Sequence, residues 1–234
     1  MIDSSAVFFH ALEARLEKYD LLKHPYYQAW SKGELTREDL REYASEYWHH
    51  VSAFPAYLSA LHSHLPDGKL RRVVLENLAD EEGLDDGNPH SDMWMDFARG
   101  MGAEEPDVRQ RNVGAETNAL LDHFRQAMKE SPAAALAALY AYESRVPAIA
   151  KTKADGLAHH YNADAKTSRY FTVHTTADVH HARVWRNALA AELAKHPEQT
   201  ESALAAGEDA ARALWNALDG VERARQARIA AAAA

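Results

Sequence analysis

Residues 35–65, LTREDLREYASEYWHHVSAFPAYLSALHSHL, carry the signals of one long helix. Thr36 is a suitable N-cap, and Asp39 follows three residues later, which resembles a capping box. Pro55 is expected to bend this helix, because a proline inside a helix has no N–H to donate to the preceding turn. Similar helical patterns recur along the chain, which has few β-branched residues and no strand-like alternation between turns. The sequence therefore predicts an all-α protein.

Breaks rich in glycine, proline and asparagine separate this helix from the others. The other expected helices cover residues 5–20, 24–33, 68–82, a segment that begins at about 89, 110–130, 132–160, 164–196 and 198–220. The loop LDDGNP lies between two of them, and residues 100–106 interrupt the chain again. Because the chain has no internal repeat or linker, a single domain over residues 1–234 is expected, with about the last ten residues frayed.

The composition excludes several classes of partner and of metal site. The formal net charge is −9 and the pI is about 5.8, which argues against a surface for nucleic acid or an anionic membrane. There is no cysteine, so any metal must bind through histidine and carboxylate. No apolar run approaches the ~20 residues of a membrane span, and the first residues lack a basic, apolar leader. A cytoplasmic protein is expected, with small molecules or proteins as partners and a homodimer as an open possibility.

The segment YFTVHTTADVHHAR, residues 170–183, spaces two imidazoles and a carboxylate at helical intervals. If the segment is one helix, His174, Asp178 and His181 share a face, because residues four and seven apart return to within ~40° of one another. His180 then points elsewhere. These residue types suit a divalent metal. With 14 histidines in the chain, a solvated face that carries them by chance is the alternative.

Two further segments place ionisable side chains where a metal could bind. In AALYAYESRVPAIAKTK, Glu143 lies in an otherwise apolar run, and Pro147 cannot donate to its carbonyl, so we expect a kink that opens room beside the carboxylate. In LENLADEEGLDDGNPH, Glu81 and Glu82 end one helix and His90 lies in the first turn of the next. A solvated acidic helix end is the alternative here, and spacing does not decide between the two glutamates.

Together these segments offer a dinuclear metal site. Its six candidate ligands are three carboxylates and three imidazoles, namely Glu81, Glu143, Asp178, His90, His174 and His181. Carboxylate-rich nitrogen and oxygen ligation suits iron or manganese, whereas structural zinc prefers four closed ligands. A ferritin-like di-iron bundle would instead use two Glu-x-x-His motifs. Glu46 and His49 supply one such motif, and no second lies on a partner helix.

Several motifs, in order, resemble those of a known family. The stretches YYQAWSKGEL, REYASEYWHHVSAFPAYLSALHS, LENLADEEG, ALYAYESRVPAIA and YFTVHTTADVHHAR are similar to the CADD-like branch of the haem-oxygenase-like dimetal oxidases, relatives of PqqC and TenA. The resemblance covers about residues 10–195. It implies a haem-oxygenase-like α-helical bundle around two iron ions, or one iron and one manganese. The ligands that it implies are the six residues already named.

The resemblance also implies an activity, the synthesis of 4-aminobenzoate for folate from the protein's own side chains. Dioxygen and a reductant would be co-substrates. The tyrosine consumed would be Tyr27, in HPYYQAW, and the lysine that supplies the amine would be Lys153. An electron-rich phenol is a good target for one-electron oxidation, and a tethered one need not be captured from solution. Tyr43 and Tyr142 are expected to relay electrons or protons.

The sequence departs from the family pattern at one place, and it is also compatible with two other functional hypotheses. The loop EGLDDGNP is longer by two residues than in the members of the family, which makes His90 the least secure ligand. A conventional dimetal oxygenase would act on a diffusible small substrate, with Tyr27 merely lining the pocket. A non-catalytic protein that stores metal or binds a partner would retain only the scaffold.

Overall fold

The computed structural model describes residues 4–84 and 87–233. Within these ranges the chain forms α-helices and short 3-10 helices and no β-strand, which confirms the all-α prediction. The α-helices are α1 (Ser4–Leu16), α2 (Pro25–Ser31), α3 (Arg37–His64), α4 (Lys69–Glu81), α5 (His90–Gly100), α6 (Glu105–Gln110), α7 (Ala115–Ala127), α8 (Pro132–Glu143), α9 (Val146–His160), α10 (Ala165–His174), α11 (Ala177–Lys195) and α12 (Thr200–Ala232). The 3-10 helices are η1 (Glu17–Tyr19), η2 (Leu21–Lys23) and η3 (Pro197–Gln199). None of the described helices combines the length and the hydropathy that a membrane span requires.

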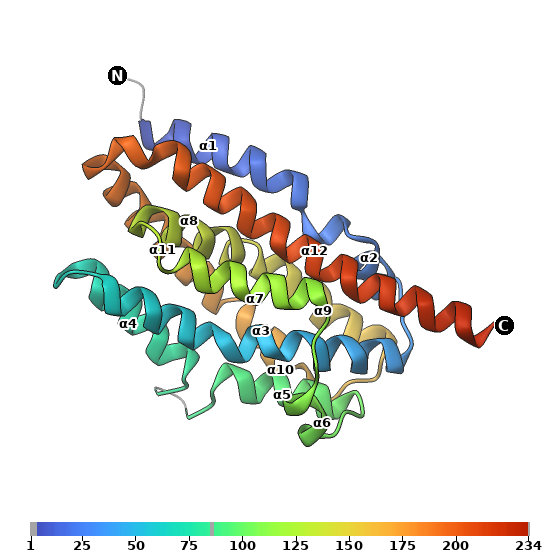
Figure 1. The fold of residues 1–234 in the computed structure, drawn as a ribbon. Helices are drawn as coiled ribbons and strands as arrows, with labels where there is room; N and C mark the ends of the chain where they lie inside the picture. Colours follow the sequence, from blue (N-terminus) through green and yellow to red (C-terminus); the bar gives the residue numbers. More distant parts are fainter. Residues whose placement is uncertain (1–3, 85–86, 234) are drawn as a thin grey trace.

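The helices pack side by side in a bundle, with α1 alongside α12 (Figure 1). Helix α8 has the sequence PAAALAALYAYE and packs against α7, α11 and α12. Residues 133–141 of this helix are all buried, as expected for a helix that is apolar on every side. Its many alanines let neighbouring helices approach closely. As a result, the last residue of α8, Glu143, lies inside the protein.

Helix α3 begins as predicted. The backbone N–H of Asp39 donates to Thr36 Oγ1 at 3.1 Å, and the backbone N–H of Thr36 donates to Asp39 Oδ2 at 2.9 Å. These two bonds complete a capping box. The helix continues through Pro55 to its end at residue 64. It packs against α4, α5 and α7 and thus carries one wall of the bundle.

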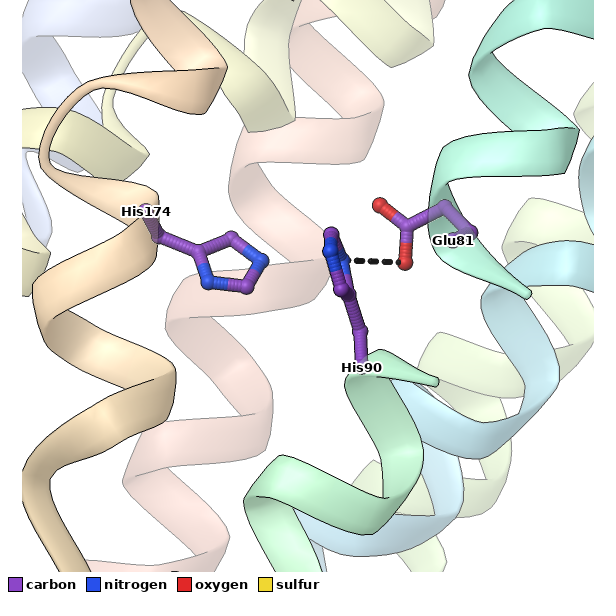
Figure 2. A group of neighbouring side chains, drawn as sticks. All are labelled: Glu81, His90 and His174. Carbon is purple, nitrogen blue, oxygen red and sulfur yellow. Dashed lines mark ion pairs between the residues drawn. The ribbon is translucent and has the colours of Figure 1, made fainter. Parts of the chain in front are cut away.

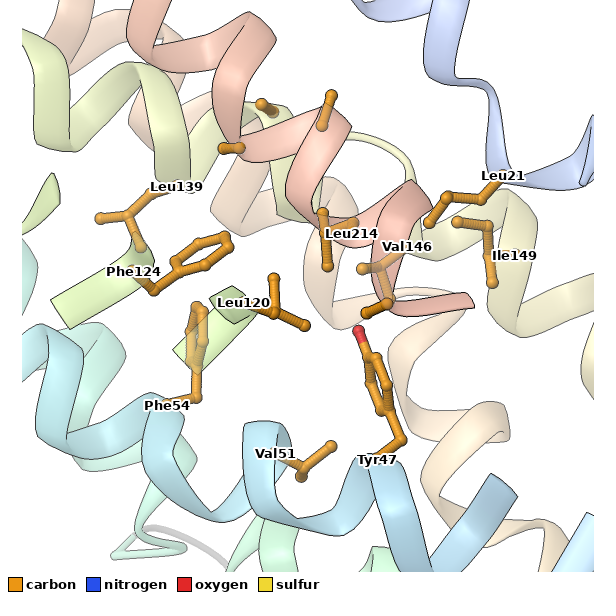
Figure 3. Close-up of a cluster of buried hydrophobic side chains, with 14 of the residues drawn as sticks. Leu21, Tyr47, Val51, Phe54, Leu120, Phe124, Leu139, Val146, Ile149 and Leu214 are labelled. Atoms are coloured by element: carbon orange, nitrogen blue, oxygen red, sulfur yellow. The ribbon is translucent and has the colours of Figure 1, made fainter. Parts of the chain in front are cut away.

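Part of the apolar core lies between α3, α7, α8 and α12 (Figure 3). Phe54 and Val51 of α3 face Phe124 and Leu120 of α7 in this view, and Leu139 of α8 lies beside them. All five side chains are buried. Val51 and Phe54 also border a small cavity that Glu143 lines, so the core continues directly to the ionisable residues.

The helix expected at residues 132–160 is two helices. The chain leaves α8 after Glu143, turns at Ser144 and Arg145, and starts α9 with Pro147 in its first turn. Pro147 has no N–H to donate to the carbonyl of Glu143, which explains why the helical hydrogen bonds are interrupted here. The kink expected at Glu143 is therefore a complete break.

The helix expected at residues 164–196 is also two helices, α10 and α11, separated by Thr175 and Thr176. The hydroxyl of Thr175 donates to the carbonyl of Thr172 at 2.7 Å, and that of Thr176 donates to the carbonyl of Val173 at 3.2 Å. Such side-chain bonds compete with the helical ladder. The prediction of one continuous helix was wrong because it ignored this competition.

The expected C-terminal boundary was wrong as well. Helix α12 does not end near residue 220 but continues to Ala232, and residue 234 lies outside the described residues. The side chains of Arg225 and Arg228 pair with Asp39 at 3.3 and 3.0 Å. These ion pairs hold the later turns of α12 against the start of α3.

Helix α6 was not expected, and α7 begins at Ala115 rather than near residue 110.

Candidate metal centre

Two groups of three buried side chains lie inside the bundle. Within each group, one potential ligand atom from each residue lies within 4.8 Å of the others. The first group is Glu81, His90 and His174, and the second is Glu143, Asp178 and His181. None of the six residues is more than 7% exposed. A small cavity borders both groups, since Glu81 and His174 line it together with Glu143 and Asp178.

The structure thus gathers all six expected residues, but not on the face of one helix. His174 is the last residue of α10, whereas Asp178 and His181 belong to α11. The break between these helices divides the three residues between the two groups. His180 is exposed, as expected. The shared-face argument selected residues that lie close together, but from a wrong assumption about the helix.

The first group joins the ends of three helices (Figure 2). His90 Nδ1 lies 2.9 Å from Glu81 Oε2, and the His90 and His174 rings meet edge to face with centroids 4.5 Å apart. His174 Nδ1 contacts the carbonyl oxygen of Tyr170 at 2.6 Å. A carbonyl only accepts, so Nδ1 carries the proton and Nε2 is left with a free lone pair. Burial lowers the pKa of His174, which keeps the ring neutral and able to bind a cation.

The second group combines two carboxylates with one imidazole. His181 Nδ1 lies 3.3 Å from Asp178 Oδ1 and 3.6 Å from Glu143 Oε2. Burial raises the pKa of Glu143 well above its usual value, and the charges of Asp178 and Glu81 raise it further. Burial opposes protonation of His181, but Asp178, Asp80 and Glu143 raise its pKa to about 11. Without a metal, the imidazolium of His181 is therefore the cation of this group.

Breaks in the helices explain how six ionisable side chains converge in an apolar bundle. Helices α4, α8 and α10 end at Glu81, Glu143 and His174, and α5 begins at His90. The carbonyl groups at a helix C-terminus carry partial negative charge, so three helix ends that meet at one place favour a cation there.

The buried polar atoms of the second group fit a metal. Glu143 Oε1 and Asp178 Oδ2 are buried and have no hydrogen-bond partner in the described part of the chain. An unpaired carboxylate oxygen is costly to bury, and a divalent ion bound to it would remove that cost. Oxygen and imidazole donors without sulfur suit iron or manganese.

Two residues that the sequence reasoning missed contact the candidate ligands. His181 Nε2 contacts Asp80 Oδ2 at 3.2 Å, on the side of the ring opposite the second group. Trp185 Nε1 donates to Glu143 Oε2 at 2.8 Å. Contacts of this kind set the tautomer and orientation of metal ligands. Trp185 lies four residues after His181, and this helical spacing was the available signal.

Tyr27, Tyr43 and Lys153 form a second buried cluster. Lys153 Nζ lies 2.8 Å from Tyr27 Oη and 2.5 Å from Tyr43 Oη, and the two hydroxyls lie 2.9 Å from each other. No carboxylate contacts the amine among the described residues, and the Lys153 side chain is buried among aromatic rings. Burial therefore lowers the pKa of Lys153 well below its usual value.

A row of aromatic side chains connects this cluster with the first metal group. Tyr43 stacks on Tyr47 with ring centroids 5.5 Å apart. Tyr142 interacts with Tyr47 and with Tyr170, and Tyr170 stacks on His174 with centroids 3.9 Å apart. Tyr142 was predicted, whereas Tyr47 and Tyr170 were missed. Each of the missed tyrosines lies four residues from a predicted site residue, Tyr43 or His174, on the same helix.

The structure also places the alternatives that the sequence left open. Glu82 is exposed and Glu81 is buried, so Glu81 belongs to the first group. His90 reaches that group even though residues 85–86 of its longer loop lie outside the described residues. The Glu46 carboxylate accepts hydrogen bonds from Arg111 and from the backbone N–H of Gly114. It is therefore not available as a metal ligand of a ferritin-like site.

Known proteins with similar sequences and folds bear related names. A family model described as iron-containing redox enzyme matches residues 41–215. The chain is 40% identical over 226 residues to a protein of Nitrosomonas europaea named 4-aminobenzoate synthase, covering 92% of this chain and 90% of that protein. A protein of the same name from Chlamydia muridarum is 38% identical over 216 residues, covering 91% and 89%.

A solved structure from Shewanella denitrificans, described as a domain of unknown function with a heme oxygenase-like fold, superposes with a TM-score of 0.80. Its sequence identity is 18%, and the match covers 97% of this chain and 95% of that one. This likeness confirms the predicted haem-oxygenase-like bundle. The chain belongs to the iron-containing redox enzymes of this fold, and within them to the group that includes the proteins named 4-aminobenzoate synthase.

Proposed function

We propose that this protein makes 4-aminobenzoate from the side chain of Tyr27, with the Lys153 amine as the source of nitrogen. One contact carries the proposal, the 2.8 Å distance between Lys153 Nζ and Tyr27 Oη. The product and the tyrosine side chain share a para-substituted benzene ring. Nitrogen stands in the product where tyrosine has its phenolic oxygen, and a carboxyl carbon stands where tyrosine has Cβ. The proposed nitrogen donor thus lies beside the oxygen that it would replace.

The state of Lys153 supports this role. An amine can attack carbon only when it is unprotonated, and the lowered pKa of Lys153 favours the neutral form. Its amine lies over the rings of Tyr27, Tyr43 and Trp30, so amine and ring are held in one geometry before reaction. Holding two reacting groups together in this way replaces an encounter in solution.

The metal groups would supply the oxidising power. Two bound ions, iron with iron or iron with manganese, would activate dioxygen with electrons from a reductant. The row of tyrosines offers a path for electrons and protons between Tyr27 and His174, through Tyr43 and Tyr142. Burial raises the pKa of both relay tyrosines well above the usual value, so each starts as a neutral phenol.

Isotope labelling tests the proposal. Protein grown on ring-labelled tyrosine, purified and incubated with Fe(II), Mn(II), reductant and dioxygen, should release labelled 4-aminobenzoate, with at most one product per chain. Peptide mapping should show a mass loss at residue 27. Tyr27→Phe removes the phenolic oxygen and should abolish product while keeping metal content. Lys153→Arg replaces the amine with a permanently charged guanidinium that does not readily deprotonate, so it should also fail.

Tyr19→Phe is the matched control, because Tyr19 lines a cavity that Tyr27 and Lys153 also line, and it contacts Lys153 in no described interaction. It should keep full yield. Several turnovers per chain, or unlabelled product, would refute self-consumption. Either result would favour an oxygenase that takes a diffusible substrate into the cavity beside Tyr27. Absence of both metal and dioxygen uptake would instead favour a non-catalytic protein.

A further inference from the structure

A cavity lies beside Tyr27 and Lys153, on the side of η1, η2 and α12. Its walls are mainly apolar, and Figure 3 shows part of the lining, with the Tyr47 ring directed towards Val146, Ile149 and Leu214. Cavities of this kind, apolar with a few polar groups, are typical sites for small organic ligands. Arg145 is the notable exception among the lining residues, because it carries a full charge into an aromatic and aliphatic surface.

Arg145 has an unused donor. Its Nη2 pairs with Glu13 Oε2 at 2.6 Å, and Glu13 is held from the other side by Tyr140, whose hydroxyl donates to Glu13 Oε1 at 2.5 Å. The Nε atom of Arg145 is buried and has no acceptor among the described residues. A guanidinium can bind a second carboxylate through its remaining N–H groups. The side chain is about one-third exposed, so it lies between the cavity and solvent.

Arg145 is also the cation that a carboxylate in this cavity would meet. The only other basic residue in the described lining is Lys153, whose amine contacts no carboxylate among the described residues and whose pKa is lowered by burial. Under the proposed function Lys153 gives up its nitrogen. Arg145 would then be the one basic side chain left in the described lining of the cavity.

We propose that this cavity binds a small aromatic carboxylate, with its ring on the apolar wall and its carboxylate on the guanidinium of Arg145. Under the proposed function, on which this identification of the ligand rests, the occupant is the freed 4-aminobenzoate before its release. Arg145 is then a product-binding residue at the exit from the reaction site.

Binding to metal-free wild-type protein tests this without turnover. Isothermal titration should give a dissociation constant at least tenfold lower for 4-aminobenzoate and for benzoate than for aniline, which has the ring without the carboxylate. Arg145→Gln should weaken benzoate binding at least tenfold. Arg125→Gln, at an exposed arginine paired with Asp122 outside the cavity, should leave it unchanged.

A further variant separates binding from folding. Glu13→Gln breaks the ion pair of Arg145 but keeps the guanidinium, so benzoate should bind as tightly as in wild type or more tightly. Equal affinity for benzoate and aniline in the wild type would overturn the proposal, as would loss of binding in Glu13→Gln equal to that in Arg145→Gln. If labelled product forms but benzoate does not bind, only this inference fails. If benzoate binds at Arg145 but no product forms from Tyr27, the carboxylate site stands and the proposed function fails.

Discussion

Lys153 is a lysine buried among aromatic side chains, where a positive charge is poorly solvated. Its amine contacts two phenolic oxygens and lies 4.2 Å from the centre of the Tyr27 ring. Hydroxyls and aromatic rings only partly replace the water lost on burial, and no described carboxylate compensates a positive charge there. The cost of desolvation therefore exceeds the gain from these contacts, and the chain keeps a neutral amine at the expense of stability.

This cost gives the free energy of unfolding a defined pH dependence. Between the lowered pKa of Lys153 in the folded protein and its usual 10.5, the unfolded chain binds one proton more than the folded chain. Stability then rises with pH. We expect Lys153→Met to be more stable than wild type at pH 7, with the difference shrinking by about 1.4 kcal/mol per pH unit towards pH 10.

Urea unfolding of metal-free protein from pH 6 to 9.5 measures this. Lys151→Met, at an exposed lysine on the same helix that pairs with Asp155, provides the control and should show no such convergence. A stability difference between wild type and Lys153→Met that does not change with pH would mean that the amine is protonated in the fold.

The six metal-group residues make a prediction about metal content. His174→Ala should remove the ion of the first group and Asp178→Ala that of the second, because loss of a ligand weakens a site strongly. After loading with Fe(II), the metal content should fall from about two ions per chain in the wild type to about one in each variant. His180→Ala, beside His181 but exposed, should keep both. Unchanged metal in the first two variants would exclude the dinuclear assignment.

At the scale of elements, the breaks matter more than the helices. The turn at Ser144 and Arg145 ends α8 so that Glu143 faces the cavity, and the turn at Thr175 and Thr176 separates His174 from Asp178. In a continuous helix at either place, each following side chain would be rotated by about 100° from the one before it. The side chains would then not reach the positions that form the two groups. The candidate ligands are thus brought together by the points at which the helices end.

Pro147→Ala tests this at the first break. Alanine restores an N–H that can bond to the carbonyl of Glu143, so α8 and α9 would tend to join and rotate the carboxylate. We expect metal affinity and product yield to fall roughly tenfold or more, with the far-ultraviolet circular dichroism little changed. Pro132→Ala, in the first turn of α8, is the control. Full yield from Pro147→Ala would show that the proline is incidental to the site.

For the whole molecule, metal binding and stability are linked. The two groups connect α4, α5, α8, α10 and α11, and without metal they hold close carboxylates, two of whose oxygens lack partners. An ion that binds only the folded chain stabilises it by about 2.7 kcal/mol at one hundred times its dissociation constant. We expect the chelated protein to melt roughly 5–10 °C below the iron-loaded one, measured by anaerobic calorimetry.

Because His181 is protonated in the metal-free fold, loading should also release protons, and metal affinity should rise with pH. Titrations in two buffers of different ionisation enthalpy measure that release. A melting temperature that is the same with and without iron would contradict the link between the centre and the fold.

The residues that gather at the candidate metal centre were largely predictable, whereas their division into two groups was not. The anomaly of Glu143 in an apolar run and the spacing of His174, Asp178 and His181 both pointed to the centre before any coordinates. They did so because burying a charge is costly, so an ionisable side chain in an apolar pattern needs a reason. Asp80 gave no such signal, since its contact with His181 joins two residues about one hundred positions apart.

What the sequence alone determined is the helical class, the capped start of α3, the exclusion of thiolate sites and the residue types of the metal centre. These follow from local periodicity, capping and composition, which depend on neighbours along the chain. Only the tertiary structure decided that the six candidate ligands form two groups, that Glu81 rather than Glu82 is buried, and that Lys153 lies against Tyr27 across 126 positions. Such contacts depend on where helices end and how they pack, and packing brings together residues whose separation in sequence carries no information about their distance in space.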